Sequence, residues 1–271
     1  MESKRYVILF CFLLIALTTI SALVGFSPAK PSASYAIATG MVKVPAGSYT
    51  LFFQNKIGTT VPVKSFYLDI RAVTNAEFLQ FVKANPRWAK SKIATLYADA
   101  GYLKHWAGDV NIGKDYDQLK DSPVTNVSWF AANAYCKWKG KRLPSLNEWE
   151  YVGKAKIVND PRPIEKIILD WYSKPTLKML PAVGTAFKNE LNIYDMHGLI
   201  WEWVSDFNSI LMEGDSRSNT AINRDLFCAS GSFGATNKED YAAFMRYAFR
   251  GSLKAKYTVS NLGFRGAKDL N

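Results

Sequence analysis

The chain opens with a long uncharged apolar run, which limits the part of the sequence that can form a globular domain. Lys4 and Arg5 precede 21 uncharged residues, 6–26. A basic start before such a run is typical of an export signal or a membrane anchor. As a helix, the run is long enough to cross the roughly 30 Å hydrocarbon core of a bilayer. Cleaved signals usually have a shorter apolar core, although small residues near its end permit cleavage, so both alternatives stay open. Either one predicts an exported, periplasmic or extracytoplasmic domain, and retention would anchor it to the inner membrane.

Residues 27–40 are rich in Pro, Ser and Ala, which predicts a linker. Residues 41–271 contain no internal repeat and no second linker, so we expect one domain there. Apolar residues make up 48% of the chain, which excludes disorder as its main state. Only two His and three Cys occur, which excludes zinc fingers, four-thiolate iron–sulfur clusters and a disulfide-rich miniprotein.

The charge balance is basic, with 34 Lys and Arg against 23 Asp and Glu and a formal net charge of +11. These basic residues are spread along the chain, which favours a solvated basic surface over a nucleic-acid site. An exported protein also rarely meets nucleic acid. Such a surface suits an acidic partner or the anionic headgroups of a membrane.

Three helices are predicted from their capping residues. Thr74 and Ser145 each begin a capping box, because a Glu follows three residues later, and Ser128 can cap a third helix. The helix that begins after Thr74 should end before Pro86, and the helix that begins after Ser128 should end at Gly140. The predicted helical ranges are 75–85, 129–139 and 146–155.

Strands are predicted where apolar and polar residues alternate. Residues 41–53, with a turn at Pro45, predict a strand pair, and residues 63–73 predict a further strand. Residues 86–122 have weak periodicity and predict a long irregular excursion. Beyond residue 155 we expect short strands and few helices, which gives an α+β fold with much irregular backbone.

Four groups of motifs follow one another along the chain. They are 41–49 (MVKVPAGSY) with 73–78 (VTNAEF); 123–129 (PVTNVSW) with 134–138 (AYCKW), 140–145 (GKRLPS) and 148–151 (EWEY); 192–198 (NIYDMHG) with 201–203 (WEW); and 230–233 (SGSF) with Arg246, Arg250 and 261–265 (NLGFR). Together they resemble the formylglycine-generating enzyme, or sulfatase-modifying factor, family over about residues 41–268. The resemblance implies a single α+β domain related to C-type lectins.

Enzymes of this family oxidise a cysteine in a sulfatase peptide to formylglycine, with a copper ion held by two cysteines. The positions of these cysteines fall on Ala235 and Ala242 here. A methyl group neither binds copper nor forms the mixed disulfide that the chemistry requires. We therefore expect a divergent member, a pseudoenzyme without copper and without the usual oxidase activity.

The other cysteines and the histidines do not replace that chemistry. Cys136 matches a position that forms a disulfide in some members, but the usual partner position is Gly266, so a small buried hydrophobe is expected. Cys228 should lie near the former active-site loop, where pairing with Cys136 or thiol reactivity stays open. His105 and His197 are too few for the nonheme-iron branch of the superfamily.

The resemblance also implies calcium near the third group of motifs, because two carboxylates among hard oxygen ligands suit this ion. The ligands would be the side chain of Asp195, the carbonyls of Gly198 and Ile200, and the carboxylate of Glu202. The alternative is a salt bridge, since a carboxylate among aromatic residues needs a cationic partner. The candidate partners of Glu202 are Arg246, Arg250 and Arg265.

The leading functional interpretation is a non-catalytic accessory or scaffold protein that kept the family's cleft and binds a peptide or protein partner. The expected cleft residues are Trp201, Ser232, Phe233, Arg246 and Arg250. A likeness to accessory members found beside copper nitrite reductase suggests a periplasmic metalloenzyme as the partner. The alternatives are an oxidase of the formylglycine-generating type with relocated chemistry, and a carbohydrate- or surface-binding module.

Overall fold

The computed structural model describes residues 40–50, 60–208 and 238–270. The predicted signal or anchor, residues 6–26, lies outside these ranges. Within them, no helix has the length and apolar character needed to cross a membrane.

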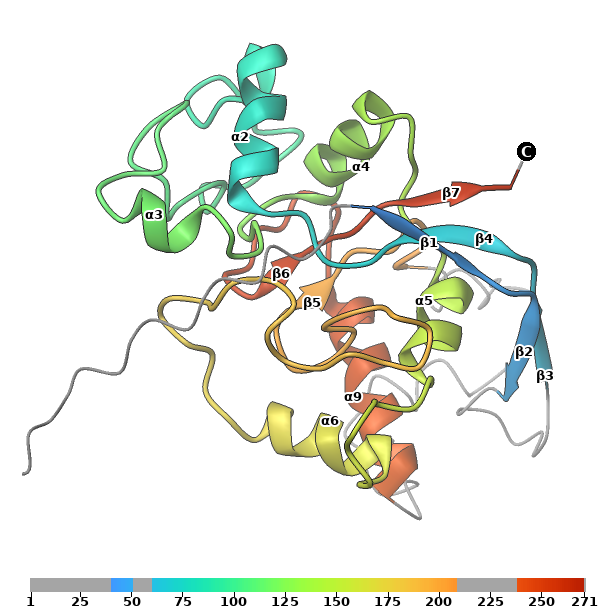
Figure 1. The fold of residues 1–271 in the computed structure, drawn as a ribbon. Helices are drawn as coiled ribbons and strands as arrows, with labels where there is room; N and C mark the ends of the chain where they lie inside the picture. Colours follow the sequence, from blue (N-terminus) through green and yellow to red (C-terminus); the bar gives the residue numbers. More distant parts are fainter. Residues whose placement is uncertain (1–39, 51–59, 209–237, 271) are drawn as a thin grey trace, which may run out of the picture. The chain divides into compact units, whose positions relative to one another are not determined.

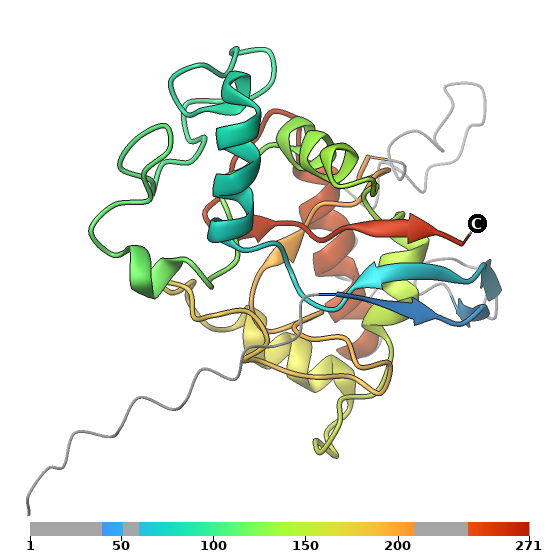
Figure 2. The same ribbon diagram turned by 45° about the horizontal axis from the view of Figure 1, so that its top comes forward.

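A three-stranded antiparallel sheet joins the beginning and the end of the domain. Its strands are β1 (Met41–Val44), β4 (Phe66–Asp69) and β7 (Ala267–Asp269), with β4 in the centre. Figure 2 shows the three strands side by side, with α5 and α9 behind them.

The register of this sheet places the first residue of β1 and the last residue of β7 at opposite ends of β4. Met41 pairs with Asp69, whereas Asp269 pairs with Phe66. Alternate residues such as Phe66 and Leu68 are buried, while Lys43 is exposed, as expected for a sheet with one face on the core.

The predicted strand pair at residues 41–53 is wrong in its pairing. Both strands form, but β1 pairs with β4, and β2 (Gly47–Thr50) pairs with β3 (Thr60–Val63). Only Pro45 and Ala46 separate β1 from β2. A two-residue hairpin turn requires a positive φ, which proline cannot adopt, so the chain passes from one sheet to the other.

The three helices predicted from their caps are confirmed. They are α2 (Asn75–Ala84), α4 (Trp129–Trp138) and α5 (Leu146–Gly153). Both capping boxes are complete, and Ser128 caps α4. The α4 helix ends before Gly140, whose φ of 66° lies in the left-handed region that favours glycine.

The long excursion after α2 is irregular, as predicted. It contains a 3-10 helix, η1 (Pro86–Trp88), and one turn of helix, α3 (Tyr116–Leu119). Further along the chain, β5 (Trp201–Glu202) pairs in parallel with β6 (Leu262–Gly263). Figure 1 shows β5 and β6 close to α9.

Two helices lie where few helices were expected, α6 (Ile164–Tyr172) and the 15-residue α9 (Lys238–Ser252). The face of α9 that packs inward carries Ala242, Arg246 and Arg250, which are four residues apart and all buried. Arginines at helical spacing do not register as an apolar stripe, so the periodicity of hydrophobic residues did not reveal this helix.

Aromatic side chains fill much of the core between α2 and α4. The ring of Phe78 stacks on Tyr135 with a centroid distance of 5.8 Å and meets the edges of Trp106 and Phe264. Such contacts join α2, α4 and the C-terminal segment that follows β6, so they fix the framework that carries the buried charges described next.

Candidate functional site

Two arginines of α9 share one carboxylate of α5 in the interior. Arg246 Nη2 lies 2.8 Å from Glu150 Oε2, and Arg250 Nη1 lies 2.6 Å from Glu150 Oε1. All three side chains are buried, so this Glu150 cluster carries a net charge of +1 away from water. Among the described residues, Nε of Arg250 has no hydrogen-bond partner.

The electrostatics of the Glu150 cluster follow from this excess of cations. Burial alone would raise the pKa of the Glu150 carboxyl, but Arg246 and Arg250 together lower that pKa to about 2. The carboxylate is therefore ionised at neutral pH and cannot serve as a general base of ordinary strength.

Trp149 links the Glu150 cluster to a second buried ion pair. Its ring lies 4.5 Å from the guanidinium carbon of Arg250, and its Nε1 donates to Glu202 Oε2 at 2.8 Å. Arg265 donates to both oxygens of Glu202 through Nε and Nη2. Of the three arginines considered for Glu202, Arg265 is thus the partner.

Asp195 has a different environment from the one expected of a metal ligand. Its Oδ1 accepts hydrogen bonds from the backbone of Ala186 and Phe187, and its Oδ2 accepts one from the backbone of Gly184. Burial raises the pKa of the Asp195 carboxyl, while these amide donors act to lower it.

The four residues proposed as calcium ligands do not fit the ion in this arrangement. Calcium takes about six to eight oxygen ligands. Glu202 directs its oxygens at a guanidinium and an indole, and Asp195 directs its oxygens at three amides. The backbone carbonyls of Gly198 and Ile200 would supply only two oxygens, and the guanidinium of Arg265 beside Glu202 would repel a cation. The described side chains thus favour the salt-bridge alternative.

His197 lies beside the Glu150 cluster. Its Nε2 is 2.9 Å from the carbonyl oxygen of Gly153, to which the neutral ring donates, and its ring meets Trp149 edge-on at 5.4 Å. Burial, reinforced by the charge of Arg246, lowers the pKa of His197 to about 3. His105 is also neutral at pH 7, because burial lowers its pKa to about 4. Across the described ranges, no three His, Cys, Asp or Glu residues gather as a metal site.

The expected cleft is only partly brought together. Arg246 and Arg250 face Glu150 in the interior rather than an open surface. Trp201 is half-buried and lines a pocket. Ser232 and Phe233, together with Ala235 and Cys228, lie outside the described residues.

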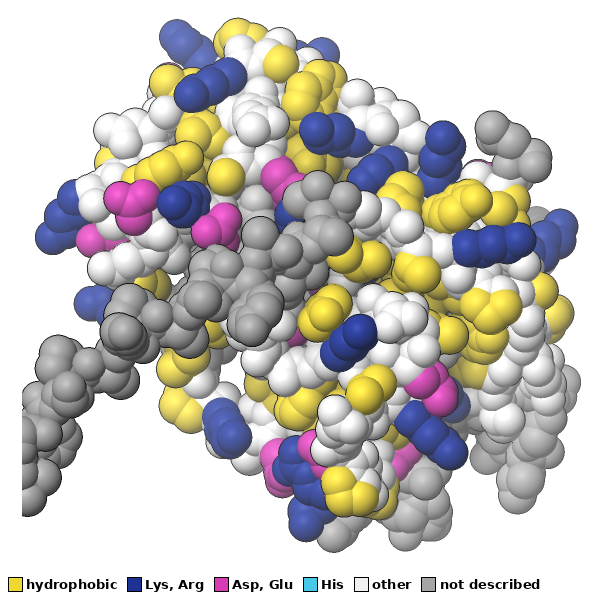
Figure 3. Space-filling view, in the orientation of Figure 1, with side chains coloured by type: hydrophobic (Ala, Val, Ile, Leu, Met, Phe, Trp, Pro, Cys, Tyr) yellow, Lys and Arg dark blue, Asp and Glu magenta, His cyan; other side chains and the backbone are white. Residues whose placement is uncertain are grey.

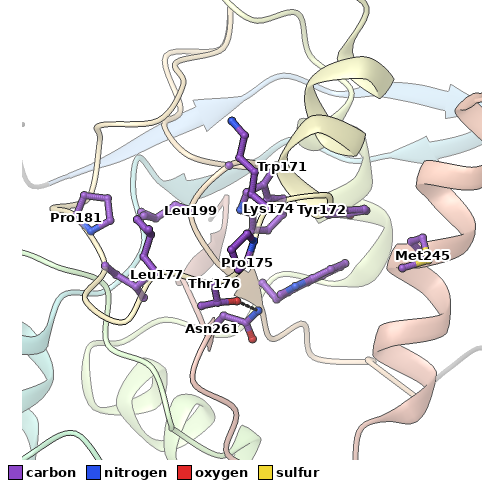
Figure 4. A pocket seen from close by; sticks show the side chains of 13 residues that line it. Trp171, Tyr172, Lys174, Pro175, Thr176, Leu177, Pro181, Leu199, Met245 and Asn261 are labelled. Atoms are coloured by element: carbon purple, nitrogen blue, oxygen red, sulfur yellow. Dashed lines mark hydrogen bonds between the residues drawn. The ribbon is translucent and has the colours of Figure 1, made fainter.

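The pocket beside Trp201 lies between α6, the loop that follows it, and α9. We call it the α6–α9 pocket; its volume is about 310 Å³. Figure 4 shows Trp171, Tyr172 and Met245 on one side and Leu177 with Pro181 on the other. This volume is at the lower end of the range of pockets that hold small ligands or a few side chains, about 300–1,000 Å³.

Aromatic stacking builds one wall of the α6–α9 pocket. Tyr172 stacks on Trp201 at 4.8 Å with an interplanar angle of 20°, and Phe249 lies on Trp201 at 4.3 Å. Trp171 is tilted against the same indole at 5.6 Å. The contacts hold the indole of Trp201 in place from both α6 and α9.

Few polar groups enter the α6–α9 pocket. Asn261 Nδ2 donates to Thr176 Oγ1 at 3.1 Å, as the dashed line in Figure 4 marks, and Lys174 adds a positive charge. No carboxylate in the described part of the chain pairs with Lys174, and the lining contains no acidic side chain. The pocket can accept an apolar group that carries or adjoins a negative charge.

The sequence analysis did not identify the α6 side of this pocket. Trp171 and Tyr172 belong to none of the four groups of motifs, and Met245 lies between the recognised positions of α9. The adjacent Trp171–Tyr172 pair was the available signal, since aromatic residues are enriched at binding surfaces.

Cys136 is buried and free, as expected of a small core residue, and burial raises the pKa of its thiol. At Gly266, the family's usual disulfide partner position, a Cβ would come within 2.8 Å of both Asp69 Oδ2 and Lys141 Cδ. A side chain at residue 266 would therefore collide with the Asp69–Lys141 ion pair.

Figure 3 shows Lys and Arg side chains spread over one face of the molecule among hydrophobic and acidic ones. They do not form a single stripe on this face. This distribution agrees with the solvated basic surface predicted from the sequence.

The chain matches the family model described as the sulfatase-modifying factor enzyme 1-like domain over residues 27–270. It therefore belongs to this family, and its fold class is the one predicted.

A formylglycine-generating enzyme of Streptomyces coelicolor is 27% identical over 295 residues, covering 89% of this chain and 93% of the relative. A Bos taurus protein named inactive C-alpha-formylglycine-generating enzyme 2 is 24% identical over 217 residues. The match covers 61% of this chain and 70% of the relative. Among solved structures, PvdO from Pseudomonas aeruginosa is similar, with a TM-score of 0.43, 20% identity, and coverage of 85% of this chain and 94% of that one.

Proposed function

We propose that this chain is an exported, non-catalytic member of the family that acts as an accessory or scaffold protein and binds a protein partner. The observation that carries the proposal is Ala242, whose methyl group is buried on α9, 1% exposed, where the family resemblance places a copper-binding cysteine. The other cysteine position, Ala235, is also alanine. Neither residue offers a thiolate for copper or for a mixed disulfide with substrate.

Two further observations support a loss of catalysis. Arg246 and Arg250 are committed to Glu150 in the interior, so neither is free to hold a substrate peptide. A curated relative from Bos taurus is itself named inactive, which makes loss of activity a precedent among similar chains.

The docking site in this proposal is the α6–α9 pocket. Trp201, which is one of the expected cleft residues, lines it together with Met245, which precedes the expected cleft residue Arg246. Its apolar walls suit an apolar side chain of an extended peptide, and Lys174 together with the net charge of +11 favours an acidic segment. A periplasmic metalloenzyme such as a copper nitrite reductase is the partner suggested by the sequence.

The catalytic part of the proposal is tested with the full-length protein, copper, oxygen and a sulfatase-type cysteine peptide. We expect no aldehyde above a control without protein, while the Streptomyces coelicolor enzyme run in parallel forms it. Aldehyde in both samples would support the alternative of an oxidase with relocated chemistry. In that case Cys228→Ser would show whether the remaining thiol carries it.

The binding part is tested with Trp201→Ala and Met245→Glu. The control is Leu96→Glu, because Leu96 is 71% exposed and belongs to the excursion after α2 rather than to the pocket. Proteins encoded by neighbouring genes are purified and titrated against the full-length chain. The proposal expects one of them to bind wild type and the control alike and at least tenfold more weakly to both pocket variants. Equal binding to all four chains would contradict the assigned pocket.

A further inference from the structure

A second pocket lies on another part of the domain, between β4, α2 and the end of α4. We call it the α2–α4 pocket; its volume is about 380 Å³. Its lining is mostly polar, and its charged groups are Asp69, Arg71, Glu77, Lys139 and Lys141. None of these residues belongs to the α6–α9 pocket.

Two ion pairs form a fixed frame for the α2–α4 pocket. Arg71 donates to both oxygens of Glu77 at 2.9 and 3.0 Å, and Glu77 is held in turn by the backbone of Thr74. Lys141 pairs with Asp69, whose second oxygen accepts from the backbone of Gly266 at 2.8 Å. Both carboxylates are thus bonded before any ligand arrives.

Tyr135 brings a hydroxyl group to the lining of this pocket. Its ring packs against Phe78, Phe81 and Phe264, and the residue is only 3% exposed. Its hydroxyl has no hydrogen-bond partner among the described residues. Burial, with the nearby charges of Glu77 and Asp69, raises the pKa of the phenol, so the hydroxyl keeps its proton and remains a donor. The hydroxyl oxygen is not among the fully buried atoms that lack a partner in the described ranges, so it is reachable from the pocket and can donate to a ligand or a water molecule there.

The charges of the lining favour an anion. Three cations, Arg71, Lys139 and Lys141, face two carboxylates that are already bonded. The ammonium of Lys139 lies over the ring of Trp138 at 4.6 Å, and it pairs with no carboxylate of the described ranges. The unused bonding capacity therefore consists mainly of N–H and O–H donors.

The size and the remaining acceptors indicate more than a bare oxyanion. A volume of about 380 Å³ has room for several water molecules beyond one small ion, since a water occupies roughly 30 Å³. Gln80 adds an amide, and the free lone pairs of Asp69 and Glu77 can accept from hydroxyl groups.

We propose that the α2–α4 pocket binds an anionic sugar: a monosaccharide-sized polyol that carries a carboxylate or a phosphate. The anionic group is held by Lys139 and the hydroxyl of Tyr135, and the sugar hydroxyls bond to Gln80 and the bonded carboxylates. This site is independent of the peptide-binding function proposed above, because it shares no residue with the α6–α9 pocket.

The test titrates the full-length protein with glucuronate, glucose 6-phosphate, glucose and inorganic phosphate, followed by calorimetry and saturation-transfer NMR. Tyr135→Phe removes only a hydroxyl that makes no internal bond, so the melting temperature should stay unchanged. We expect one or both anionic sugars to bind and glucose to bind much more weakly. Tyr135→Phe should lower the affinity for the anionic sugars about tenfold, because it removes one hydrogen bond to a charged group. Tyr116→Phe, at an exposed tyrosine of α3, is the matched control and should change nothing.

Lys139→Gln separates charge from shape, because it should weaken the anionic sugars and leave glucose unaffected. Glucuronate binding alone would identify the carboxylate source, and glucose 6-phosphate binding alone the phosphate source. Failure of both anionic sugars to bind would overturn the proposal. The proposal would also be overturned if Tyr135→Phe and Lys139→Gln bound the anionic sugars as tightly as wild type does. Binding of inorganic phosphate as tight as that of the sugars would overturn it too.

Discussion

The guanidinium of Arg265 donates to both carboxylate oxygens of Glu202, and neither side chain is exposed to solvent. The two residues are far apart in sequence, and their contact joins the segment after β6 to β5. Removing one partner of a buried ion pair leaves an uncompensated charge, which costs about 3–5 kcal/mol. The domain should therefore be sensitive to a substitution that neutralises either residue of this pair.

We predict that Arg265→Met lowers the free energy of unfolding by about 3–5 kcal/mol, measured by urea denaturation. Asp269→Asn is the control, because Asp269 is an exposed partner of Arg142 and should cost under about 1 kcal/mol. Similar losses in the two variants would show that the buried pair carries no special weight.

We predict that calcium does not stabilise the domain, because the oxygens of Glu202 and Asp195 are already bonded to protein donors. A ligand specific for the native state adds about 2.7 kcal/mol at a hundredfold excess over its Kd. The melting temperature should therefore be the same in millimolar calcium and in chelator. A rise of several degrees with calcium that Glu202→Gln abolishes would restore the metal site implied by the family resemblance.

We predict that substitutions of different members of the Glu150 cluster lower the free energy of unfolding by different amounts. Glu150→Gln leaves two buried guanidinium groups without a counter-charge and should cost about 3–5 kcal/mol. Arg250→Met leaves a neutral pair of Glu150 with Arg246 and should cost less, about 1–2 kcal/mol, mainly for its contact with Trp149. Chemical denaturation of both variants measures the difference. A larger loss of stability in Arg250→Met than in Glu150→Gln would contradict this explanation from the net charge of the cluster.

His197 predicts a loss of stability in mild acid. Its pKa falls from about 6.5 in the unfolded chain to about 3 in the folded one. Between these values the unfolded state binds the extra proton, so stability is fully present above pH 6.5 and declines as the pH falls toward 3. The decline from pH 6.5 to 5 should be about 2 kcal/mol smaller in His197→Gln, whose amide does not titrate. Parallel pH profiles of wild type and variant would show that His197 does not titrate this way.

Gly263 predicts a steric limit at β6. A Cβ at this residue would overlap the carbonyl oxygen of Val124 and come within 2.7 Å of Ile200 Cδ1. Because the backbone of Val124 cannot move without losing its own contacts, Gly263→Ala should cost more than 2 kcal/mol, at the upper end of the range for overpacking. Gly108→Ala is the control, since its Cβ would meet nothing closer than 3.9 Å. Thermal unfolding that ranks both variants equally would argue against this close approach.

Local signals were sufficient for the helices that begin with a side-chain cap. Thr74, Ser128 and Ser145 bond within three residues of themselves, so their sequence neighbours contain the required information. Strand pairing was not predictable in this way, because Val44 pairs with Phe66 of β4 and not with the residues of β2 that follow it closely in the sequence. The fold class followed from the motifs, and the pairing required the tertiary structure.

The candidate site was predictable in its components but not in its connections. Glu202 was recognised as a carboxylate that needs a partner, yet sequence alone left three arginines equivalent. Glu150 lay inside a recognised motif without any sign that it would bind Arg246 and Arg250. Ion pairs between residues about 60 to 100 positions apart depend on how the helices pack, and no local pattern encodes that distance.

The sheet that holds both ends of the domain also determines how the domain responds to pulling. β1 and β7 flank β4 and run parallel to each other, with Met41 at one end of β4 and Asp269 at the other. Tension between the two ends is therefore directed along the strands and loads their backbone hydrogen bonds together, in shear, instead of opening them one by one. The domain should therefore resist force applied between Met41 and Asp269 more strongly than force applied across the strands.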